Sequence, residues 1–315
     1  MRPTLYLLTG PSAVGKTEFS LDWAERHNAE IISCDSLLCY RGMHIGTARP
    51  SPAALRRVPH HGMDLCPVRR QLSIREYLAA AEKAVRDVLS RSRNVLVVGG
   101  SGFYLKAFFA PVVDTLEIPQ GVRQEVTELY AKQGLDGVVR RLRDLNPQGL
   151  SPLDIRNPRR VLKALERCLA AQQPLKELRA RFAAQRTPFD GFQKELCRLS
   201  RSRESLYRRV ELRTKLMLKE GLVEEVHALK AQGLLENPSA AAAIGYREVL
   251  ACLRGDAGFG ELEAAIVRRT RALIRKQCTW FLQQLPPHRV VNLDAISTND
   301  YCDCPFVFEG SPMDA

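Results

Sequence analysis

Eight consecutive residues near the N-terminus have the types and spacing needed to bind a phosphate group: Gly10, Pro11, Ser12, Ala13, Val14, Gly15, Lys16 and Thr17. They satisfy the pattern G-x-x-x-x-G-K-[ST] and directly follow an apolar strand candidate, Thr4 to Thr9. Where a strand ends at glycine and the chain restarts as a helix, unpaired backbone N–H groups converge, and the helix dipole adds positive potential. Lys16 would neutralise phosphate charge, and the Thr17 hydroxyl would ligate Mg²⁺ shared with phosphate oxygens. An ordinary glycine turn is the alternative, and the complete motif disfavours it.

Asp35 is the second candidate for chemistry. It ends the segment Ala29 to Asp35, which the apolar pattern predicts to be a short buried strand. A carboxylate at the carboxyl end of a parallel strand lies where open α/β sheets bind ligands. The Asp-Ser pair is also favourable turn chemistry, so a cap or turn role for Asp35 stays open.

A third candidate is Ser101, which lies among glycines directly after another apolar run, Asn94 to Val98. Such a run is typical of a parallel strand covered on both faces. An ATPase would carry an acidic residue at about this place, so ordinary nucleotide hydrolysis is disfavoured. The glycines around Ser101 allow the backbone to approach a ligand closely, with the hydroxyl as donor or acceptor.

Basic residues recur in three later segments. The stretch from Pro111 to Phe192 is rich in arginine, and a helix pattern from Glu204 to Lys230 carries Arg209 and Arg213 four residues apart. A long basic helix is predicted over Glu261 to Leu285, where one face presents Arg268, Arg271 and Arg275. A solvated helix face is the default interpretation for any single cation. The density of arginines, and a row at this spacing, favour a nucleic-acid backbone as the partner.

The elements that position these residues follow from periodicity. Helices are expected over Lys16 to His27 and Ser73 to Arg91, and the short segment Leu196 to Leu199 is expected to be the last strand. We therefore predict an α/β fold: a P-loop-containing parallel sheet core with helices on both faces, a helical insertion and C-terminal helices. The expected divisions are 1–113 and 193–293 for the core, 114–192 for the insertion and 294–315 for a tail.

Composition limits the class of protein. The chain has 315 residues, 45% of them hydrophobic, and a formal net charge of +12, which favours a polyanionic partner. We expect a cytoplasmic protein, because no signal-peptide pattern or membrane-length apolar run is present. We also expect it to be a monomer. The nine cysteines are mostly scattered singly, so reduced thiols are expected, and Cys302 and Cys304 near the end are weak metal candidates.

Seven blocks resemble, in order and across most of the chain, those of the tRNA dimethylallyltransferases, which prenylate the adenosine next to the anticodon. The blocks are GPSAVGKT, DSLLCYRGMHIGTARP from Asp35, VPHHGMDL from Val58, VGGSGFYLKA from Val98, NPRRVLKALE from Asn157, AIGYRE from Ala243 and TRALIRKQCTWF from Thr270. A shared phosphate loop alone would mean little, whereas seven ordered blocks are specific.

The resemblance implies transfer of a dimethylallyl group from dimethylallyl diphosphate to N6 of the adenosine 3′-adjacent to the anticodon of tRNA. It implies Mg²⁺ as cofactor and tRNA contacts from Asp35, Ser36, Leu37, Leu38, Ser101, Arg123, Arg159, Arg160, Val161, Leu162 and Lys163. Lys16, magnesium on Thr17 and Arg209 or Arg213 suit a departing diphosphate. Asp35 suits the role of base toward N6. The target base must leave its stack to reach such a site.

The chain departs from the family pattern at three positions. Ser101 stands where threonine is usual and keeps the hydroxyl, so we expect its role to survive. Leu38 stands where many members have glutamine, which puts a side-chain hydrogen bond to tRNA from this position in doubt. Ile274 interrupts a typical alanine-lysine-arginine run, which is interpreted as a packing change.

Three rival functions share parts of this pattern. A small-molecule P-loop kinase would share the loop and the acid, but it needs a site for the ATP base, and nothing after Tyr104 signals one. A prenyltransferase acting on free AMP or ADP is disfavoured by the arginine-rich insertion. A non-catalytic RNA-binding protein would have no reason for an intact Lys16-Thr17 pair and Asp35.

Overall fold

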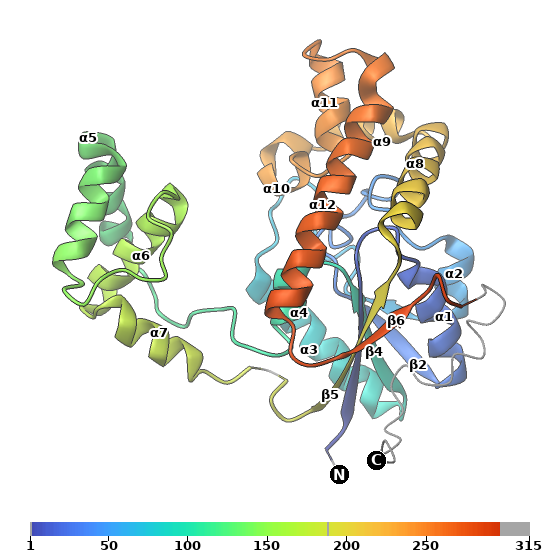
Figure 1. The fold of residues 1–315 in the computed structure, drawn as a ribbon, viewed down its shortest axis with the longest axis horizontal. Coiled ribbons are helices and arrows are strands. Elements are labelled where there is room, and N and C mark those ends of the chain that lie inside the picture. The colour runs from blue at the N-terminus through green and yellow to red at the C-terminus, as the bar shows by residue number, and fades with distance from the viewer. Residues whose placement is uncertain (1, 188, 297–315) are drawn as a thin grey trace. The chain divides into compact units, whose positions relative to one another are not determined.

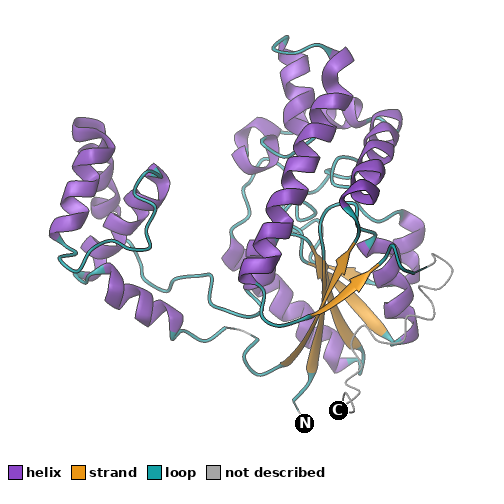
Figure 2. Cartoon of the chain, in the orientation of Figure 1, coloured by secondary structure: helices purple, strands orange, loops and turns teal. Residues whose placement is uncertain are grey.

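The computed structural model describes residues 2–187 and 189–296. Its centre is a six-stranded parallel sheet with strand order β3-β2-β4-β1-β5-β6 (Figures 1 and 2). The strands are β1 (Thr4–Thr9), β2 (Ala29–Ser33), β3 (His60–His61), β4 (Asn94–Gly99), β5 (Gln193–Ser200) and β6 (Arg289–Asn292). The expected parallel α/β core is therefore confirmed.

Helices pack on this sheet and on one another. They are α1 (Lys16–Arg26), α2 (Pro52–Arg57), α3 (Ile74–Ser90), α4 (Gly102–Lys106), α8 (Arg203–Lys219), α9 (Leu222–Ala231), α10 (Pro238–Ala241), α11 (Tyr246–Arg254) and α12 (Leu262–Gln284), with the 3₁₀ turns Leu234–Glu236 and Phe259–Glu261. The chain crosses from β1 to β2 in one direction along the sheet and from β3 to β4 in the other. Since such crossovers are right-handed, α1 and α3 lie on opposite faces.

The strand order creates a switch point between β1 and β4. The loop after β1 leads toward β2, whereas the chain after β4 leads toward β5 on the other side of β1. Open α/β sheets bind ligands at such a crevice, outside the carboxyl ends of the strands. The register pairs Thr9 with Gly99 and Ser33 with Val98, so three strands end at the same edge.

The buried core explains why these strands form. Leu5, Leu7 and Leu8 of β1 are fully buried, as are Leu96 and Val97 of β4. A continuous apolar run suits a central parallel strand, which has no solvent-facing side. On α3, Ser73 and Glu76 form a capping box, which confirms the helix start expected from the sequence.

A second compact unit comprises Ala110–Thr187, separate from the unit of Met1–Phe109 and Pro188–Ala315. It consists of α5 (Gln120–Asp144), which is kinked at Gly134, α6 (Pro158–Ala171) and α7 (Leu175–Ala183). Its own core includes Val138, Leu142, Val161 and Leu165. The sequence therefore encodes a helical body with an independent apolar centre.

The bounds of the core, its last strand and the tail differ from the expected ones. Residues 189–192 belong with the sheet, because Phe189 is buried and stacks on Phe108 with ring centroids 4.4 Å apart. The expectation that the last strand lies at Leu196–Leu199 was wrong, since β6 follows and pairs with β5. Asp294, expected to begin a tail, accepts hydrogen bonds from Ser202 N and Arg201.

Two further expectations concern the chain ends and membranes. Cys302 and Cys304 lie outside the described residues, so the structure does not test their interpretation. None of the helices in the described part of the chain has an apolar stretch long enough to cross a bilayer.

Glu30 on β2 is a buried carboxylate that ties the sheet to neighbouring loops. Its side chain is 3% exposed, and it accepts hydrogen bonds from Arg91 Nη2 at 2.7 Å, Arg93 Nη1 at 3.1 Å and the His61 ring at 2.6 Å. Burial raises the pKa of this carboxyl, but the hydrogen bonds from these three groups outweigh it and lower the pKa to about 2. A carboxylate with a depressed pKa stabilises the fold above its unfolded pKa and loses that contribution as pH falls.

We predict that Glu30→Gln lowers the free energy of unfolding at pH 7 by about 1–3 kcal/mol, because Arg91 and Arg93 lose their ion pairs with Glu30. The loss is limited because both arginines remain partly solvated. The difference from the parent should shrink as pH falls from about 4.5 toward about 2, where the parent carboxylate is protonated as well. Urea unfolding at a series of pH values measures it, with Glu82→Gln on α3, which loses only a surface ion pair with Arg86, as the control. A difference independent of pH would contradict the assignment.

Candidate functional site

The phosphate-binding loop joins β1 to α1 with the backbone that its sequence predicts. Gly15 has φ 110°, a left-handed conformation that glycine adopts without strain, and α1 begins at Lys16. Gly10 cannot be replaced easily, because a Cβ there would lie 2.7 Å from the Leu199 carbonyl oxygen. The loop therefore wraps a space at the N-terminus of α1, where backbone N–H groups favour an anion.

Lys16 is positioned over this loop. Its Nζ donates hydrogen bonds to the carbonyl oxygens of Gly10 at 2.9 Å and Pro11 at 3.0 Å. Burial lowers the pKa of Lys16 to about 8, with Arg213 acting in the same direction and the Asp35 charge opposing. An anionic ligand would stabilise the charged form of this ammonium, which burial and the nearby cation disfavour.

Two arginines support the loop: Arg209 on α8, and Arg201, which directly follows β5. Arg209 Nε donates to the Ala13 carbonyl at 2.7 Å, and Arg201 Nε donates to the Val14 carbonyl at 2.9 Å. The Arg209 guanidinium also lies 3.8 Å from a Glu18 oxygen. Arg209 therefore supports the loop shape as well as contributing positive charge, whereas Arg201 was not singled out from the sequence.

Asp35 lies two residues beyond the end of β2 and faces the same space. Its Oδ1 accepts a hydrogen bond from Leu37 N at 2.9 Å, which is the turn interaction considered as an alternative in the sequence. Ser36 N donates to Ser101 Oγ at 3.1 Å, so the segments after β2 and β4 are joined. The turn and the site are not exclusive, because the same turn directs the Asp35 carboxylate into the pocket that it lines.

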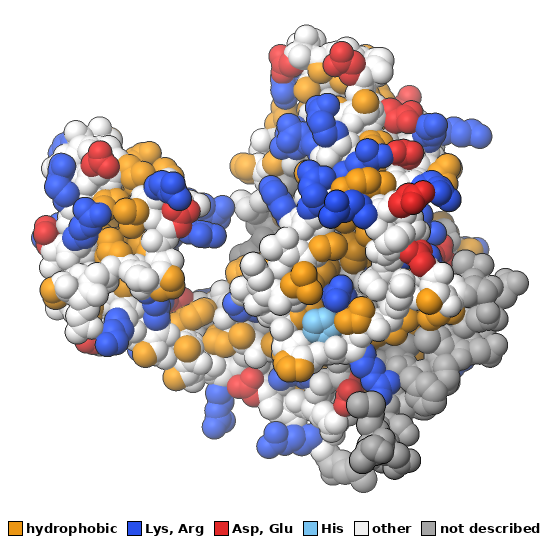
Figure 3. Space-filling model, in the orientation of Figure 1, with side chains coloured by type: hydrophobic (Ala, Val, Ile, Leu, Met, Phe, Trp, Pro, Cys, Tyr) orange, Lys and Arg blue, Asp and Glu red, His pale blue; other side chains and the backbone are white. Residues whose placement is uncertain are grey.

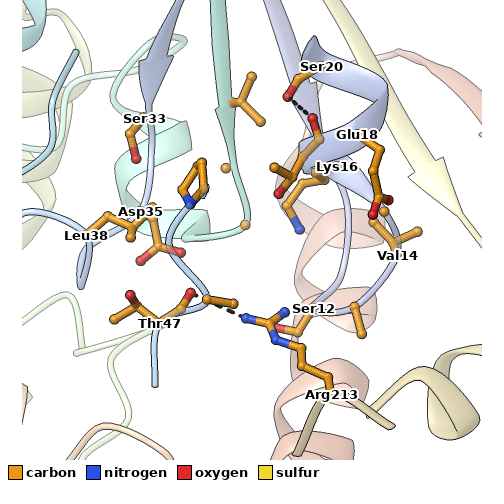
Figure 4. A pocket seen from close by; sticks show the side chains of 18 of the residues that line it. Ser12, Val14, Lys16, Glu18, Ser20, Ser33, Asp35, Leu38, Thr47 and Arg213 are labelled. Carbon is orange, nitrogen blue, oxygen red and sulfur yellow. Dashed lines mark hydrogen bonds between the residues drawn. The ribbon is translucent and has the colours of Figure 1, made fainter. Parts of the chain in front are cut away.

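Arg213 on α8 completes a group of charges. Figure 4 shows Asp35, Lys16 and Arg213 directed into one space from three elements. The pKa of Arg213 is lowered by burial and by Arg209, while Asp35 acts in the opposite direction. Its Nη2 donates to the Thr47 carbonyl at 3.3 Å. The space is thus positive overall and suits a ligand with more than one negative charge.

Two adjoining cavities open here. The first, of about 440 Å³, is lined by the phosphate loop, Thr17, Asp35, Leu38 and both Arg209 and Arg213. The second, of about 670 Å³, is also lined by Asp35 and Arg213, and it extends to Ser36, Leu37 and Ser101. Its walls are more apolar and include Met217, Ile266, Leu273, Trp280 and Phe281. An anionic group and an apolar group of one substrate can therefore lie on either side of Asp35.

Gln277 on α12 was not identified as a functional residue from the sequence. Its Oε1 accepts a hydrogen bond from Ser12 N at 2.9 Å, and its Nε2 donates to the Gly100 carbonyl at 3.0 Å. One amide therefore joins the loop after β1 to the loop after β4. The signal in the sequence was its place in the TRALIRKQCTWF block, which gives no side-chain geometry.

Thr17 lines the first cavity and is exposed, so its hydroxyl is accessible to a ligand. No group of three or more His, Cys, Asp or Glu residues is arranged to hold a metal ion within residues 2–187 and 189–296. The single Thr17 hydroxyl fits Mg²⁺, which is commonly held by one or two protein oxygens together with substrate phosphates. It does not fit an ion held by protein ligands alone.

The basic face of α12 is more constrained than its sequence suggested. Lys and Arg side chains gather over α12 in Figure 3. Arg271 forms an ion pair with Glu211 and lies over the Tyr207 ring, 4.5 Å from its centroid. Arg275 Nη1 donates to the Tyr207 hydroxyl at 3.2 Å, and Arg268 is exposed. The expected row is present, but Arg271 is partly neutralised within the protein.

The remaining candidates lie in the second unit. Arg123 is exposed near the start of α5, and Arg159 and Arg160 are exposed in the first turn of α6. Lys163 pairs with Glu166 at 2.7 Å, and Leu162 is half-buried. Val161 is fully buried in the core of this unit, so its side chain faces inward instead of forming an RNA contact.

The fold and the site together define an enzyme of the P-loop class, with a positively charged cavity beside a largely apolar one. A family model described as IPP transferase matches residues 38–284. The chain is 54% identical to the tRNA dimethylallyltransferase of Opitutus terrae, over 92% of this chain and 94% of that protein. It is 33% identical to the tRNA dimethylallyltransferase of Geobacter sulfurreducens, over 93% and 94%. The chain belongs to the IPP transferase family.

Solved structures agree with this assignment. The full-length tRNA isopentenylpyrophosphate transferase from Bacillus halodurans is 26% identical with a TM-score of 0.69, over 96% of this chain and 94% of that one. A eukaryotic dimethylallyltransferase acting on tRNA has a TM-score of 0.79 at 20% identity, over 92% and 74%, and it supports the fold alone.

We predict that Gln277→Ala lowers kcat/KM of the transfer reaction about tenfold, because Ser12 N and the Gly100 carbonyl lose their shared partner. Gln277→Glu should be more harmful, because it keeps only the acceptor and adds negative charge beside the phosphate loop. Steady-state kinetics measures both, with Gln283→Ala on an exposed position of α12 as the control. Equal activity of Gln277→Ala and the parent would show that the bridge is dispensable.

Proposed function

We propose that this protein transfers a dimethylallyl group from dimethylallyl diphosphate to N6 of the adenosine 3′-adjacent to the anticodon in tRNA. The observation that carries the proposal is that Asp35 lies between a phosphate cavity and a largely apolar cavity. The family relatives named tRNA dimethylallyltransferase support it. A kinase would not require the apolar walls supplied by α12.

The phosphate cavity supports departure of the diphosphate. The allylic C–O bond breaks as negative charge grows on the diphosphate, so groups that stabilise that charge lower the barrier. The loop N–H groups, Lys16 and Arg213 are arranged around the first cavity. Mg²⁺ bound through Thr17 and phosphate oxygens would supply further positive charge.

Asp35 supports the other half of the reaction. The lone pair of adenine N6 is delocalised into the ring, so a carboxylate that accepts an N6 proton raises its nucleophilicity. Nitrogen forms the new bond to the allylic carbon, diphosphate leaves with the C–O bonding pair, and Asp35 takes the proton. Ser101 and Ser36, which are joined by a hydrogen bond, line the cavity beside Asp35 and can contact the extruded nucleoside.

The remaining surface suits tRNA. The formal net charge is +12, and exposed cations occur on α12 and on the second unit. Phosphate contacts from such residues supply affinity and register without reading sequence. We include Arg123, Arg159, Arg160, Lys163, Arg268 and Arg275 among the proposed contacts, together with the partly neutralised Arg271.

The direct test is mass analysis of nucleosides from tRNA incubated with the protein, Mg²⁺ and dimethylallyl diphosphate. We expect a prenylated adenosine with the parent and none with Lys16→Ala, because the lysine cation serves the diphosphate. Lys16→Ala should still bind tRNA with nearly parental affinity in a gel-shift assay. The proposal fails if the parent forms no prenylated adenosine, or if ATP replaces dimethylallyl diphosphate as the substrate consumed.

We predict that Asp35→Asn lowers the rate of the chemical step about 10²–10⁴-fold, with little change in affinity for dimethylallyl diphosphate. The amide can still accept a hydrogen bond from Leu37 N, so the turn is preserved while the negative charge is lost. Single-turnover kinetics at saturating substrates measures the effect. A near-parental rate would reduce Asp35 to a turn residue and require another proton acceptor.

A further inference from the structure

The loop that precedes Thr47 is bound by a single carboxylate from α9. Glu225 accepts hydrogen bonds from three consecutive backbone amides: His44 N at 3.0 Å, Ile45 N at 2.7 Å and Gly46 N at 3.2 Å. Charge-assisted hydrogen bonds to a carboxylate are roughly twice as strong as neutral ones. Three of them on one side chain fix the backbone path of this loop.

Tyr246, at the start of α11, also binds Glu225. Its hydroxyl donates to Glu225 Oε1 at 2.6 Å. The Tyr246 ring is fully buried against Gly46, where an added Cβ would lie 2.4 Å from a ring carbon. Burial and the adjacent Glu225 charge raise the pKa of Tyr246, so the hydroxyl stays protonated and remains a donor.

The next residue, Thr47, connects this arrangement to the active site. Thr47 lines both cavities, and its carbonyl oxygen accepts the hydrogen bond from Arg213 Nη2. The Thr47 hydroxyl donates to the Met43 carbonyl at 2.7 Å, which further restricts the loop. Within the described part of the chain, Arg213 Nε is buried without a hydrogen-bond partner. The position of the Thr47 carbonyl therefore bears directly on where the Arg213 guanidinium points.

Arg213 needs such support before substrate binds. It is half-buried near Arg209 and Lys16, both positive, and its attractive charge partner in the cavity is Asp35. Without a fixed acceptor, repulsion would favour conformations that take the guanidinium away from the place where diphosphate charge develops. Stabilisation of a transition state is most effective when the charged group is already in place.

We propose that Glu225 and Tyr246 are positioning residues that hold Thr47 so that its carbonyl directs Arg213 toward the phosphate cavity. The inference rests on the proposed function for its catalytic consequence. The polar arrangement outside the pocket thus acts on the leaving group through one backbone carbonyl. Neither Glu225 nor Tyr246 needs to touch the substrate.

The experiment uses Tyr246→Phe and Glu225→Gln in the full chain, with Glu224→Gln, the exposed neighbouring acid on α9, as the matched control. Tyr246→Phe keeps the ring packed on Gly46 and removes only the hydroxyl. We expect kcat/KM for dimethylallyl diphosphate to fall about tenfold in Tyr246→Phe, the scale of one lost charge-assisted hydrogen bond. The loss should be larger in Glu225→Gln, because its amide nitrogen cannot accept from the backbone N–H groups. The KM for tRNA and the behaviour of Glu224→Gln should stay at parental values.

A double-mutant cycle with Arg213→Ala separates positioning from general stability. If Tyr246→Phe acts through Arg213, it should cause little further loss in the Arg213→Ala background. Full additivity, or a loss that also weakens tRNA binding, would overturn the inference. Calorimetric binding of inorganic diphosphate gives a readout independent of transfer: Tyr246→Phe should bind it more weakly than the parent, and equal affinity would contradict the proposal. A parent that binds diphosphate but forms no prenylated adenosine would instead refute the proposed function.

Discussion

The site depends first on how closely the ends of three parallel strands approach one another. Gly99 at the end of β4 leaves no room for a side chain, because a Cβ there would lie 1.9 Å from the Cys34 carbonyl oxygen. Cys34 N donates to the Val98 carbonyl at 2.7 Å, and Thr9 Oγ1 donates to the Gly99 carbonyl at 2.8 Å. These contacts fix the starting points of the three loops that carry the phosphate-binding residues, Asp35 and Ser101.

Helices from the C-terminal half supply the remaining walls of the pocket. α8 supplies Arg213 and Arg209, and α12 supplies Gln277 and the apolar walls of the second cavity. Figure 1 shows α8 and α12 alongside each other, and they are in contact. Because the two helices belong to one packed unit with the sheet, the anionic and apolar halves of the pocket keep a fixed spacing around Asp35.

Much of this could be predicted from the sequence, and the limits have physical causes. The phosphate loop is recognisable because eight adjacent residues determine its backbone, and the central strands are recognisable from their apolar runs. The bridge through Gln277 and the role of Thr47 depend on contacts between segments far apart in the chain. The edge strand β6 was missed because it has only four residues and no long apolar pattern. The buried Val161 shows that a family contact site can include residues that serve the core.

The position of Lys16 has a consequence for protons. Among the described residues, the hydrogen-bond partners of its Nζ are the carbonyl oxygens of Gly10 and Pro11, and its pKa is about 8. An anion in the loop would raise that pKa, because it favours the charged form of the lysine. At a pH near 8, occupancy of the loop is therefore linked to net uptake of hydrogen ions from the buffer, and departure of the anion is linked to their return. Lys16 thereby couples its own protonation to each cycle of anion binding and release.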